Sequence, residues 1–224
     1  MKIKFGYKKI HLMYQYELDE LIINNNLEPI DEIEFSFPFM QFNLKKIPQS
    51  VSVLKFNYEF FDLSCEIPPN IKSVYFHKFT DLLEELPNTI EHIQIYKGFN
   101  HMVDKLGDHF KSINFGHNFN QPVDNLPSRL EKVVFNSSFT YPINNLPSNI
   151  KFIHILNSNY DYASIKILPK SIILLQLGIN NYLDYNNGIE FDFDLGGKKF
   201  ISSIERIYDE KSQTLLKNIY FYKN

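Results

Sequence analysis

Histidine and acidic side chains are the residues of this sequence whose types could support metal binding or proton transfer. His101, His109 and His117 follow one another at intervals of eight residues. That interval matches neither the ligand spacing of a zinc finger nor the i, i+4 pair of a metalloprotease helix. Histidines spread through a periodic array are more typical of surface positions than of ligands. We therefore expect no metal centre among the histidines of the periodic part of the chain, which are His77, His92, His101, His109, His117 and His154.

A second group of candidate ligands lies near the C-terminus, where Glu190, Asp192 and Asp194 alternate with apolar residues. Alternation puts the three carboxylates on one face of a strand, where they could hold a cation. A solvated strand face explains them more simply, because edge charges also block unwanted strand pairing. The following GGKK (196–199) lacks the spacing of a phosphate-binding P-loop. The sequence thus predicts a protein without enzymatic activity, cofactor or metal.

Composition narrows the class of protein further. The 224 residues carry a net charge of −3, with a pI of about 6.2. This balance argues against a nucleic-acid binder and gives no electrostatic reason to bind an anionic membrane. Cys65 is the single cysteine, so it cannot form an intramolecular disulfide or a Cys-based zinc site. The N-terminus lacks an apolar signal core, and no run of about 20 apolar residues exists. We expect a cytoplasmic protein, with the monomer favoured.

The chain is organised around a repeated unit of about 20 residues. Each copy contains the pattern apolar-x-x-apolar-x-apolar, usually preceded by Leu-Pro or Ile-Pro. Successive copies start 21, 20, 19, 20, 20, 20 and 22 residues apart. Before the copy that starts at Phe110, the pair is Leu106-Gly107, so the proline is missing there. The copies are Ile30/Ile33/Phe35, Val51/Leu54/Phe56, Ile71/Val74/Phe76, Ile90/Ile93/Ile95, Phe110/Ile113/Phe115, Leu130/Val133/Phe135, Ile150/Ile153/Ile155 and Ile172/Leu175/Leu177.

The repeated pattern predicts a strand rather than a helix. Its last two apolar positions are two residues apart and so share one strand face, whereas a helical face needs the spacing i, i+3, i+4, i+7. The prolines before most copies break any helix, and the β-branched and aromatic residues favour strand. Equal spacing implies parallel strands about 4.8 Å apart. The returns between strands are too short for two helical turns, so we expect them to be extended or 3-10. Their recurrent apolar residues should stack inward, and these are Phe99, Phe119, Phe139, Val103, Val123 and Ile143.

The predicted fold is a β-rich, leucine-rich-repeat-like solenoid, a right-handed coil with one parallel sheet, short strands and mostly non-helical returns, capped at both ends. Residues 1–27 form the N-terminal cap, with a short strand near Ile3 and a helical segment at 13–23. The repeats occupy 28–178. Residues 179–224 hold a degenerate repeat, a hairpin at 189–204 and the C-terminal cap. The pattern returns at Leu216/Ile219/Phe221, two periods after Ile172, which predicts one degenerate turn in between and then a final strand.

The strand residues between the inward positions should form columns on the opposite, exposed face of the sheet. Tyrosine and histidine on such a face suit protein recognition, because they contribute contact area at low entropic cost. An equally weighted alternative is that these residues only satisfy β propensity on a solvated sheet. The candidate partner-binding residues are Tyr75, His77, His92, Gln94, Tyr96 and Asn114, with a more apolar group formed by Val134, Phe152, His154 and Leu156.

Residues 115–123, FGHNFNQPV, followed by Leu126-Pro127, resemble the FNIP repeat family, whose consensus is close to LPxxIxxIxFGxxFNQPI. The similarity is strongest at 106–127 and extends over 47–177. FNIP repeats are regarded as relatives of leucine-rich repeats and are numerous in slime moulds and in giant viruses of amoebae. The resemblance implies a curved parallel solenoid with a role in protein interaction. Many members carry an F-box that links them to a ubiquitin ligase, but residues 1–27 are too short for one.

Three functional hypotheses follow from the sequence. The first is a non-enzymatic module, such as an adaptor or substrate-recognition protein, that binds a protein partner through the exposed face of the sheet. The second is a structural protein whose open ends or hairpin pair with another copy. The third, an enzyme, depends on a metal or pocket near Glu190, Asp192 and Asp194.

Overall fold

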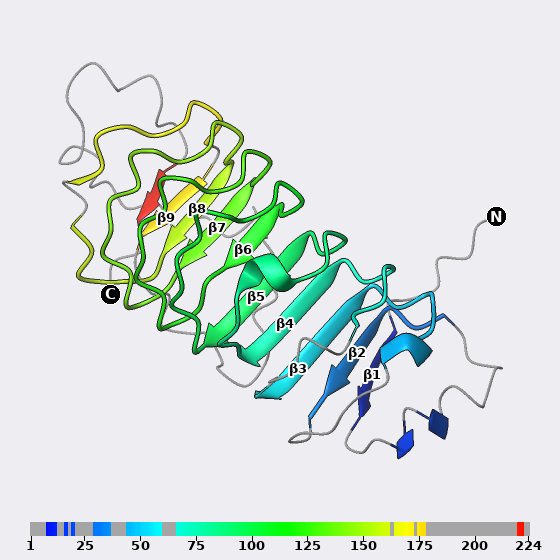
Figure 1. The fold of residues 1–224 in the computed structure, drawn as a ribbon. Helices are drawn as coiled ribbons and strands as arrows, with labels where there is room; N and C mark the ends of the chain where they lie inside the picture. Colours follow the sequence, from blue (N-terminus) through cyan, green and yellow to red (C-terminus); the bar gives the residue numbers. More distant parts are fainter. Residues whose placement is uncertain are drawn as a thin grey trace.

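The strands form one ten-stranded sheet in which all nine neighbouring pairs run parallel, in the order of the sequence. The computed structural model describes residues 8–12, 16–17, 19–20, 29–36, 44–59, 66–161, 164–172, 174–177 and 219–221. Figure 1 shows the strands side by side along one axis, with the returns joining each strand to the next. The strands are β1 (Lys9–Leu12), β2 (Glu32–Phe35), β3 (Val53–Glu59), β4 (Ser73–Lys78), β5 (His92–Lys97), β6 (Ser112–Asn114), β7 (Lys132–Phe135), β8 (Phe152–Ile155), β9 (Leu174–Leu177) and β10 (Ile219–Phe221).

The predicted class, a parallel β-solenoid with one strand per repeat, is confirmed. Helix is scarce in the part of the chain that the structure describes. It comprises two 3-10 turns, η1 (Leu44–Lys46) and η2 (Leu83–Glu85), and the helical residues 16–17 and 19–20 within the helical segment predicted at 13–23. No helix among these residues is long and apolar enough to span a membrane.

The register of the sheet follows the sequence repeat. The central apolar residue of each copy lies beside the central apolar residue of the next, as Ile93 does with Ile113 and Ile113 with Val133. A shift by one residue would move the whole apolar set to the other face, so the buried face fixes the register. Each copy of the repeat therefore makes one coil.

The Leu-Pro pair explains how each strand begins. Leu126 is buried, and the carbonyl of Pro127 accepts a hydrogen bond of 3.1 Å from the amide of Leu130. This turn needs the proline carbonyl and not the missing N–H, so proline costs no hydrogen bond there. Gly107 takes the same place one coil earlier, and the bond from the Phe110 amide is longer, at 3.5 Å.

Two facing columns of aromatic rings fill the coils. The strand column includes Phe115 and Phe135, and the return column includes Phe119 and Phe139. The rings of Phe115 and Phe119 are 4.1 Å apart, and those of Phe135 and Phe139 are 4.0 Å apart. The inward stacking predicted for the return residues is confirmed, because each is at most 1 % exposed. These residues are Phe99, Phe119, Phe139, Val103, Val123 and Ile143, and the return column extends further to Phe79 and Tyr160.

Asparagine side chains connect successive coils on the return side. The Oδ1 of Asn100 accepts a hydrogen bond of 2.8 Å from the Asn120 amide, and the Oδ1 of Asn120 accepts one of 2.9 Å from the Thr140 amide. Irregular returns leave backbone groups without ladder partners, and these side chains supply them. The asparagine of the FNxP pattern is therefore a structural link between coils.

Both ends of the array differ in detail from the sequence prediction. The N-terminal cap supplies β1 to the same sheet, with Ile10 beside Ile33. The predicted strand near Ile3 lies outside the described residues. At the other end β10 confirms the final strand, but it pairs directly with β9, with Ile219 beside Leu175. No strand therefore lies between β9 and β10 in the sheet, and the degenerate turn predicted between them falls outside the described residues. The hairpin at 189–204 lies outside the described residues.

Candidate partner-binding face

The outward face of the sheet, opposite the aromatic core, carries the predicted columns. Pairing of β4 with β5 and of β5 with β6 puts Tyr75, Gln94 and Asn114 in one row across the strands. The same row continues through Val134 to His154. The predicted alignment of these side chains is confirmed, because it depends only on the register.

Exposure divides the predicted site into two parts. Tyr75, His77, His92, Gln94, Tyr96 and Phe152 are partly or fully exposed. The other four candidates are buried, with exposed fractions of 6 % for Asn114, 2 % for Val134, 4 % for His154 and 5 % for Leu156. The expectation that these four lie on an open surface was wrong.

The neighbours of Asn114 illustrate why a position on the outward face does not ensure exposure. The Oδ1 of Asn114 accepts hydrogen bonds from Nδ2 of Asn136, at 2.8 Å, and from the amide of Gly116, at 3.2 Å. Asn136 is itself only 5 % exposed. A side chain covered in this way is satisfied within the chain and presents little surface to a partner.

The exposed candidates form a cluster of rings over β4, β5 and the turn after β6. The rings of His77 and Tyr96 are stacked 5.0 Å apart, and Tyr96 meets His117 edge-to-face at 4.8 Å. The Nζ of Lys55 lies 4.9 Å from the centre of the Tyr75 ring. We call Tyr75, His77, Tyr96 and His117 the aromatic–histidine cluster.

His117 was absent from the predicted site because it follows the strand rather than lying within it. Gly116 has a φ of 78°, which turns the chain at this point. The His117 amide then donates a hydrogen bond of 2.8 Å to the carbonyl of Tyr96. A Cβ on Gly116 would lie 2.8 Å from the carbonyl oxygen of Ile95, so the close approach of the coils requires glycine. The glycine of the FGxxFN pattern was the available signal.

Burial sets the protonation of the histidines on this face. It lowers the pKa of His117. It also lowers the pKa of His92, where Lys111 and Lys132 act in the same direction and Glu91 opposes them. Both rings are therefore neutral near pH 7.

Lys132 is a further feature that sequence reasoning did not select. It lies in the row His92, Ser112, Lys132 and Phe152 across four neighbouring strands. Burial lowers its pKa to about 8. Its ammonium group is thus partly desolvated while it still carries its charge near pH 7.

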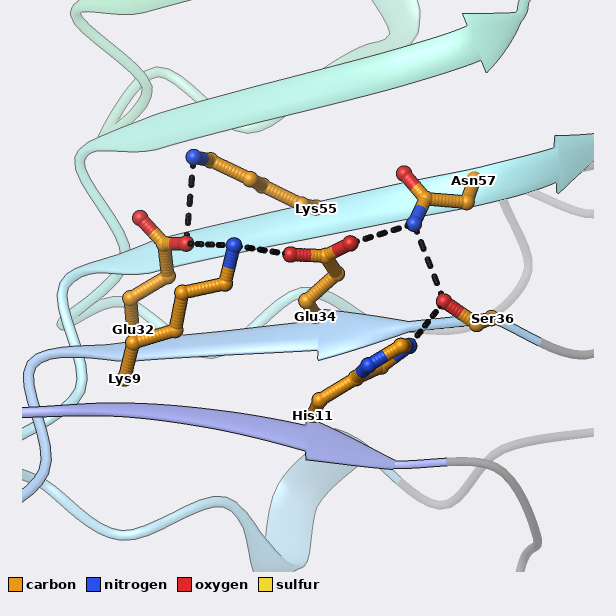
Figure 2. A network of polar contacts seen from close by, with 7 residues as sticks. All are labelled: Lys9, His11, Glu32, Glu34, Ser36, Lys55 and Asn57. Carbon is orange, nitrogen blue, oxygen red and sulfur yellow. Dashed lines mark hydrogen bonds and ion pairs between the residues drawn. The ribbon is translucent and has the colours of Figure 1, made fainter. Parts of the chain in front are cut away.

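The N-terminal part of the outward face is a network of charged and polar groups (Figure 2). Glu32 is 2 % exposed, and its Oε1 lies 3.1 Å from Nζ of Lys55 and 3.4 Å from Nζ of Lys9. Lys9 also pairs with Glu34, whose other oxygen accepts a hydrogen bond of 2.5 Å from Asn57. Opposite charges on adjacent strands stabilise a sheet.

Ser36 connects the same network to His11 on the neighbouring strand β1. Asn57 donates a hydrogen bond of 2.9 Å to the Ser36 hydroxyl, which also contacts the His11 ring. Burial raises the pKa of Glu34, but the hydrogen bonds from Lys9 and Asn57 outweigh it and hold the pKa below its usual value. We call Lys9, His11, Glu32, Glu34, Ser36, Lys55 and Asn57 the polar network.

A row of alternating charges borders the outward face where the strands begin. Glu91 lies 2.5 Å from Lys111 and 3.7 Å from Lys72, measured between carboxylate oxygen and Nζ. Glu131 lies 2.8 Å from Lys151. These pairs neutralise one another, so the border adds little net charge to the face.

The described residues form no metal site. They contain no group of three histidine, cysteine or acidic side chains arranged to hold a metal ion. The acidic residues Glu190, Asp192 and Asp194 and the single Cys65 lie outside the described part of the chain. No family model matches the chain, and a search of curated proteins returns no match to its sequence.

Proposed function

We propose that the protein is an interaction module that binds a protein partner through the central outward face, which comprises β4, β5 and the turn after β6. The observation that carries this proposal is the aromatic–histidine cluster, whose rings are partly exposed and held at fixed distances by the sheet register. Tyrosine is enriched at the energetic centres of interfaces. A rigid scaffold also reduces the entropy lost on binding.

The two neighbouring parts of the face support the same location. The charged groups of the polar network on β1 to β3 form ion pairs with one another. Beyond β5 the buried residues are Asn114, Val134, His154 and Leu156. The central face lies between them, and the rings of its cluster remain partly exposed. The residues of the outward row also vary from coil to coil, whereas the inward row repeats Phe, Ile, Val and Leu.

We further infer that the coils are FNIP-like repeats, a class related to leucine-rich repeats. Each residue of the pattern has a packing role that supports this inference. Gly116 permits the close approach of two coils, Phe119 is fully buried in the return column, and Asn120 links its coil to the next. Because the pattern describes the scaffold, specificity is left to the outward residues. An adaptor role, in which the module brings one protein to another, fits this arrangement.

A triple substitution tests the proposed function. Tyr75→Ala with His77→Ala and Tyr96→Ala removes most of the cluster without touching the core, so the fold should survive. Affinity capture from the native cell, followed by mass spectrometry, should recover a partner with the wild type and lose it with the triple variant.

Tyr141→Ala is the matched control for this experiment. Tyr141 is 37 % exposed on a return segment, so its loss removes an exposed tyrosine away from the central face. The control should capture the partner as the wild type does. Equal capture by the triple variant, with an unchanged circular dichroism spectrum, would show that the partner binds elsewhere.

A second candidate function is self-assembly, and the open sheet favours it. β1 and β10 are its end strands, and an end strand offers backbone groups to another chain. Light scattering at high concentration decides between the two functions. Mass that grows with concentration supports assembly, and a constant monomer mass rules it out.

A further inference from the structure

Five successive returns form one aligned surface along the array. The Oδ1 of Asn100 accepts a hydrogen bond from the Asn120 amide in the next return, and the Oδ1 of Asn144 accepts one of 2.7 Å from the Lys166 amide. Each return also buries one apolar residue at the same point of its coil, and these residues are Leu83, Val103, Val123, Ile143 and Ile165. We call the exposed side of the returns 80–88, 100–108, 120–128, 140–148 and 164–170 the return surface.

Most of the exposed large apolar side chains lie on the return surface. The described residues expose five such side chains, of which only Tyr16 lies elsewhere. Leu82 and Met102 belong to the first two returns, and Tyr141 and Ile167 belong to the last two. Met102 is 60 % exposed and Ile167 is 66 % exposed. A line of exposed apolar side chains is typical of a surface that contacts another protein.

Charge on the return surface changes sign from its first return to its last. The first return carries three carboxylates and no cation, the fourth is uncharged, and the last carries two lysines and no carboxylate. These charged residues are Asp81, Glu84, Glu85, Lys166 and Lys170. In the part of the chain that the structure describes, none of their side chains has an ion-pair partner. Their charges therefore contribute to the field that another molecule meets.

One two-fold axis through the third return matches both patterns. It places the first return of one copy against the last return of a second, antiparallel copy, and the second return against the fourth. Leu82 then faces Ile167 of the second copy, and Met102 faces Tyr141. The carboxylates of the first return face the two lysines of the last. A two-fold interface repeats every such contact, so each complementary pair occurs twice.

We propose that the return surface binds a second copy of this chain in an antiparallel dimer. This inference goes beyond the proposed function, because the aromatic–histidine cluster takes no part in it. The five returns are separated by four coil spacings of about 4.8 Å, which gives a contact about 19 Å long. Such a contact is at the small end of specific interfaces, so the dimer is weak. Unlike pairing through end strands, it is closed and does not continue into a filament.

Asp124 lies in the third return, beside the proposed axis, where it meets its own counterpart. Its Oδ1 accepts a hydrogen bond of 2.8 Å from Nδ2 of Asn145. Two carboxylates that approach each other at the axis weaken the dimer. Asp124→Asn keeps an oxygen for Asn145 and removes the charge, so it should tighten the dimer by about twofold to fivefold.

Sedimentation equilibrium of the full chain tests the dimer through two charge-reversed variants. The wild-type mass should rise with concentration, level off at twice the monomer mass of 26.6 kDa, and fall as salt is added. Glu84→Lys with Glu85→Lys should weaken the dimer by about tenfold or more, and so should Lys166→Glu with Lys170→Glu. An equal mixture of the two variants should form a heterodimer, because each first return then meets a last return of opposite charge.

Two further variants guard against indirect effects. Met102→Ser reverses no charge and should weaken the dimer by about threefold or more, because it removes apolar contact area. Lys97→Glu reverses an exposed charge at the end of β5, away from the return surface, and should change dimerisation by less than about twofold.

The dimer proposal is overturned by a wild-type mass that stays monomeric at every concentration, or by a mixture of the two charge-reversed variants that stays monomeric. A mass that continues to grow beyond the dimer would indicate end-strand assembly instead. The triple variant of the aromatic–histidine cluster should dimerise as the wild type does, and its loss of the cellular partner would leave the dimer standing. Loss of the dimer in that variant would place the contact on the central face and exclude the return surface.

Discussion

The polar network and the aromatic–histidine cluster lie on the same face of the same sheet, but their side chains differ. Those of the network pair with one another, and the rings of the cluster remain partly exposed. In the polar network Glu32 is surrounded by Lys9 and Lys55, and Asn57 joins Glu34 to Ser36. In the cluster, rings of Tyr75, His77 and Tyr96 remain partly exposed. The first region uses its polar groups to stabilise the chain, and the second leaves surface available.

Alignment of outward residues by the sheet register is therefore not sufficient to form a binding site. The coils place every outward residue in a row, whatever its chemistry. Where neighbours in a row carry opposite charges, as Lys9 and Glu32 do, they pair with each other. Tyr75 and Gln94 are also neighbours in a row, and both side chains remain partly exposed.

Loss of Glu32 has the largest effect that we expect. Glu32→Ala leaves the Lys55 ammonium, whose side chain is 10 % exposed, without its buried carboxylate. Removing one partner of a buried ion pair costs about 3 kcal/mol of the free energy of unfolding. Urea denaturation should show this loss, while partner binding by the folded protein stays unchanged.

Two variants test whether the cost comes from the unpaired charge. Glu84→Ala removes an exposed glutamate from a return and should change stability by less than about 0.5 kcal/mol. Glu32→Leu combined with Lys55→Met replaces both charges by apolar groups and should recover most of the lost stability. A double variant as unstable as Glu32→Ala would mean that the network does not act through charge compensation.

A smaller effect is expected at Gly116, and it connects stability with the central face. Gly116→Ala strains a residue with a φ of 78° and drives its Cβ to 2.8 Å from the Ile95 carbonyl oxygen. We expect a cost of about 2 kcal/mol. Because the coils must separate there, the contact between Tyr96 and His117 should loosen and partner binding should weaken.

Gly107→Ala is the matched control for that prediction. Its Cβ would meet the ring of His109 at 2.6 Å, and a side chain can rotate away where a backbone carbonyl cannot. The cost should be less than half of that for Gly116→Ala, with partner binding intact. Equal losses of stability in calorimetry would contradict the role given to backbone approach.

Most of the scaffold could be predicted from the sequence because the same physical constraint recurs in each coil. Phe119 and Phe139 were assigned to an inward column by their spacing alone, and both are fully buried. The turn from Pro127 to Leu130 likewise follows from local chemistry. The order of strands was harder to predict where the repeat ended, because the two periods between Ile172 and Leu216 do not tell that β10 pairs directly with β9.

The candidate site was predicted less completely, because exposure depends on what covers a residue and not on its position in a repeat. The rows that contain Tyr75 and Val134 were correctly aligned, yet Val134 is buried. His117 was missed because a glycine turn, rather than strand alternation, brings it beside Tyr96. The polar network could have been found by asking which charges the register makes neighbours.

The smallest expected effect separates the two regions by pH. The pKa of Glu34 is held below its ordinary value of 4.5, so its contribution to stability is present above that pH and is lost as the pH falls through the lower, folded value. Burial lowers the pKa of His117 from its ordinary 6.5, so its contribution is present above pH 6.5 and is lost as the pH falls toward the folded value. The central face should therefore lose stability at a higher pH than the polar network.

The loss that comes from His117 should amount to less than about 1 kcal/mol of the free energy of unfolding, because the ring is partly solvated. Urea midpoints measured across this range should show that His117→Gln removes only the His117 share of the loss near pH 6, because burial also lowers the pKa of His92 and His109. Lys9→Met should reduce only the share that Glu34 contributes at lower pH. Parallel curves for His117→Gln and the wild type around pH 6 would mean that the His117 ring is solvated, and the packing of the cluster would then have to be revised.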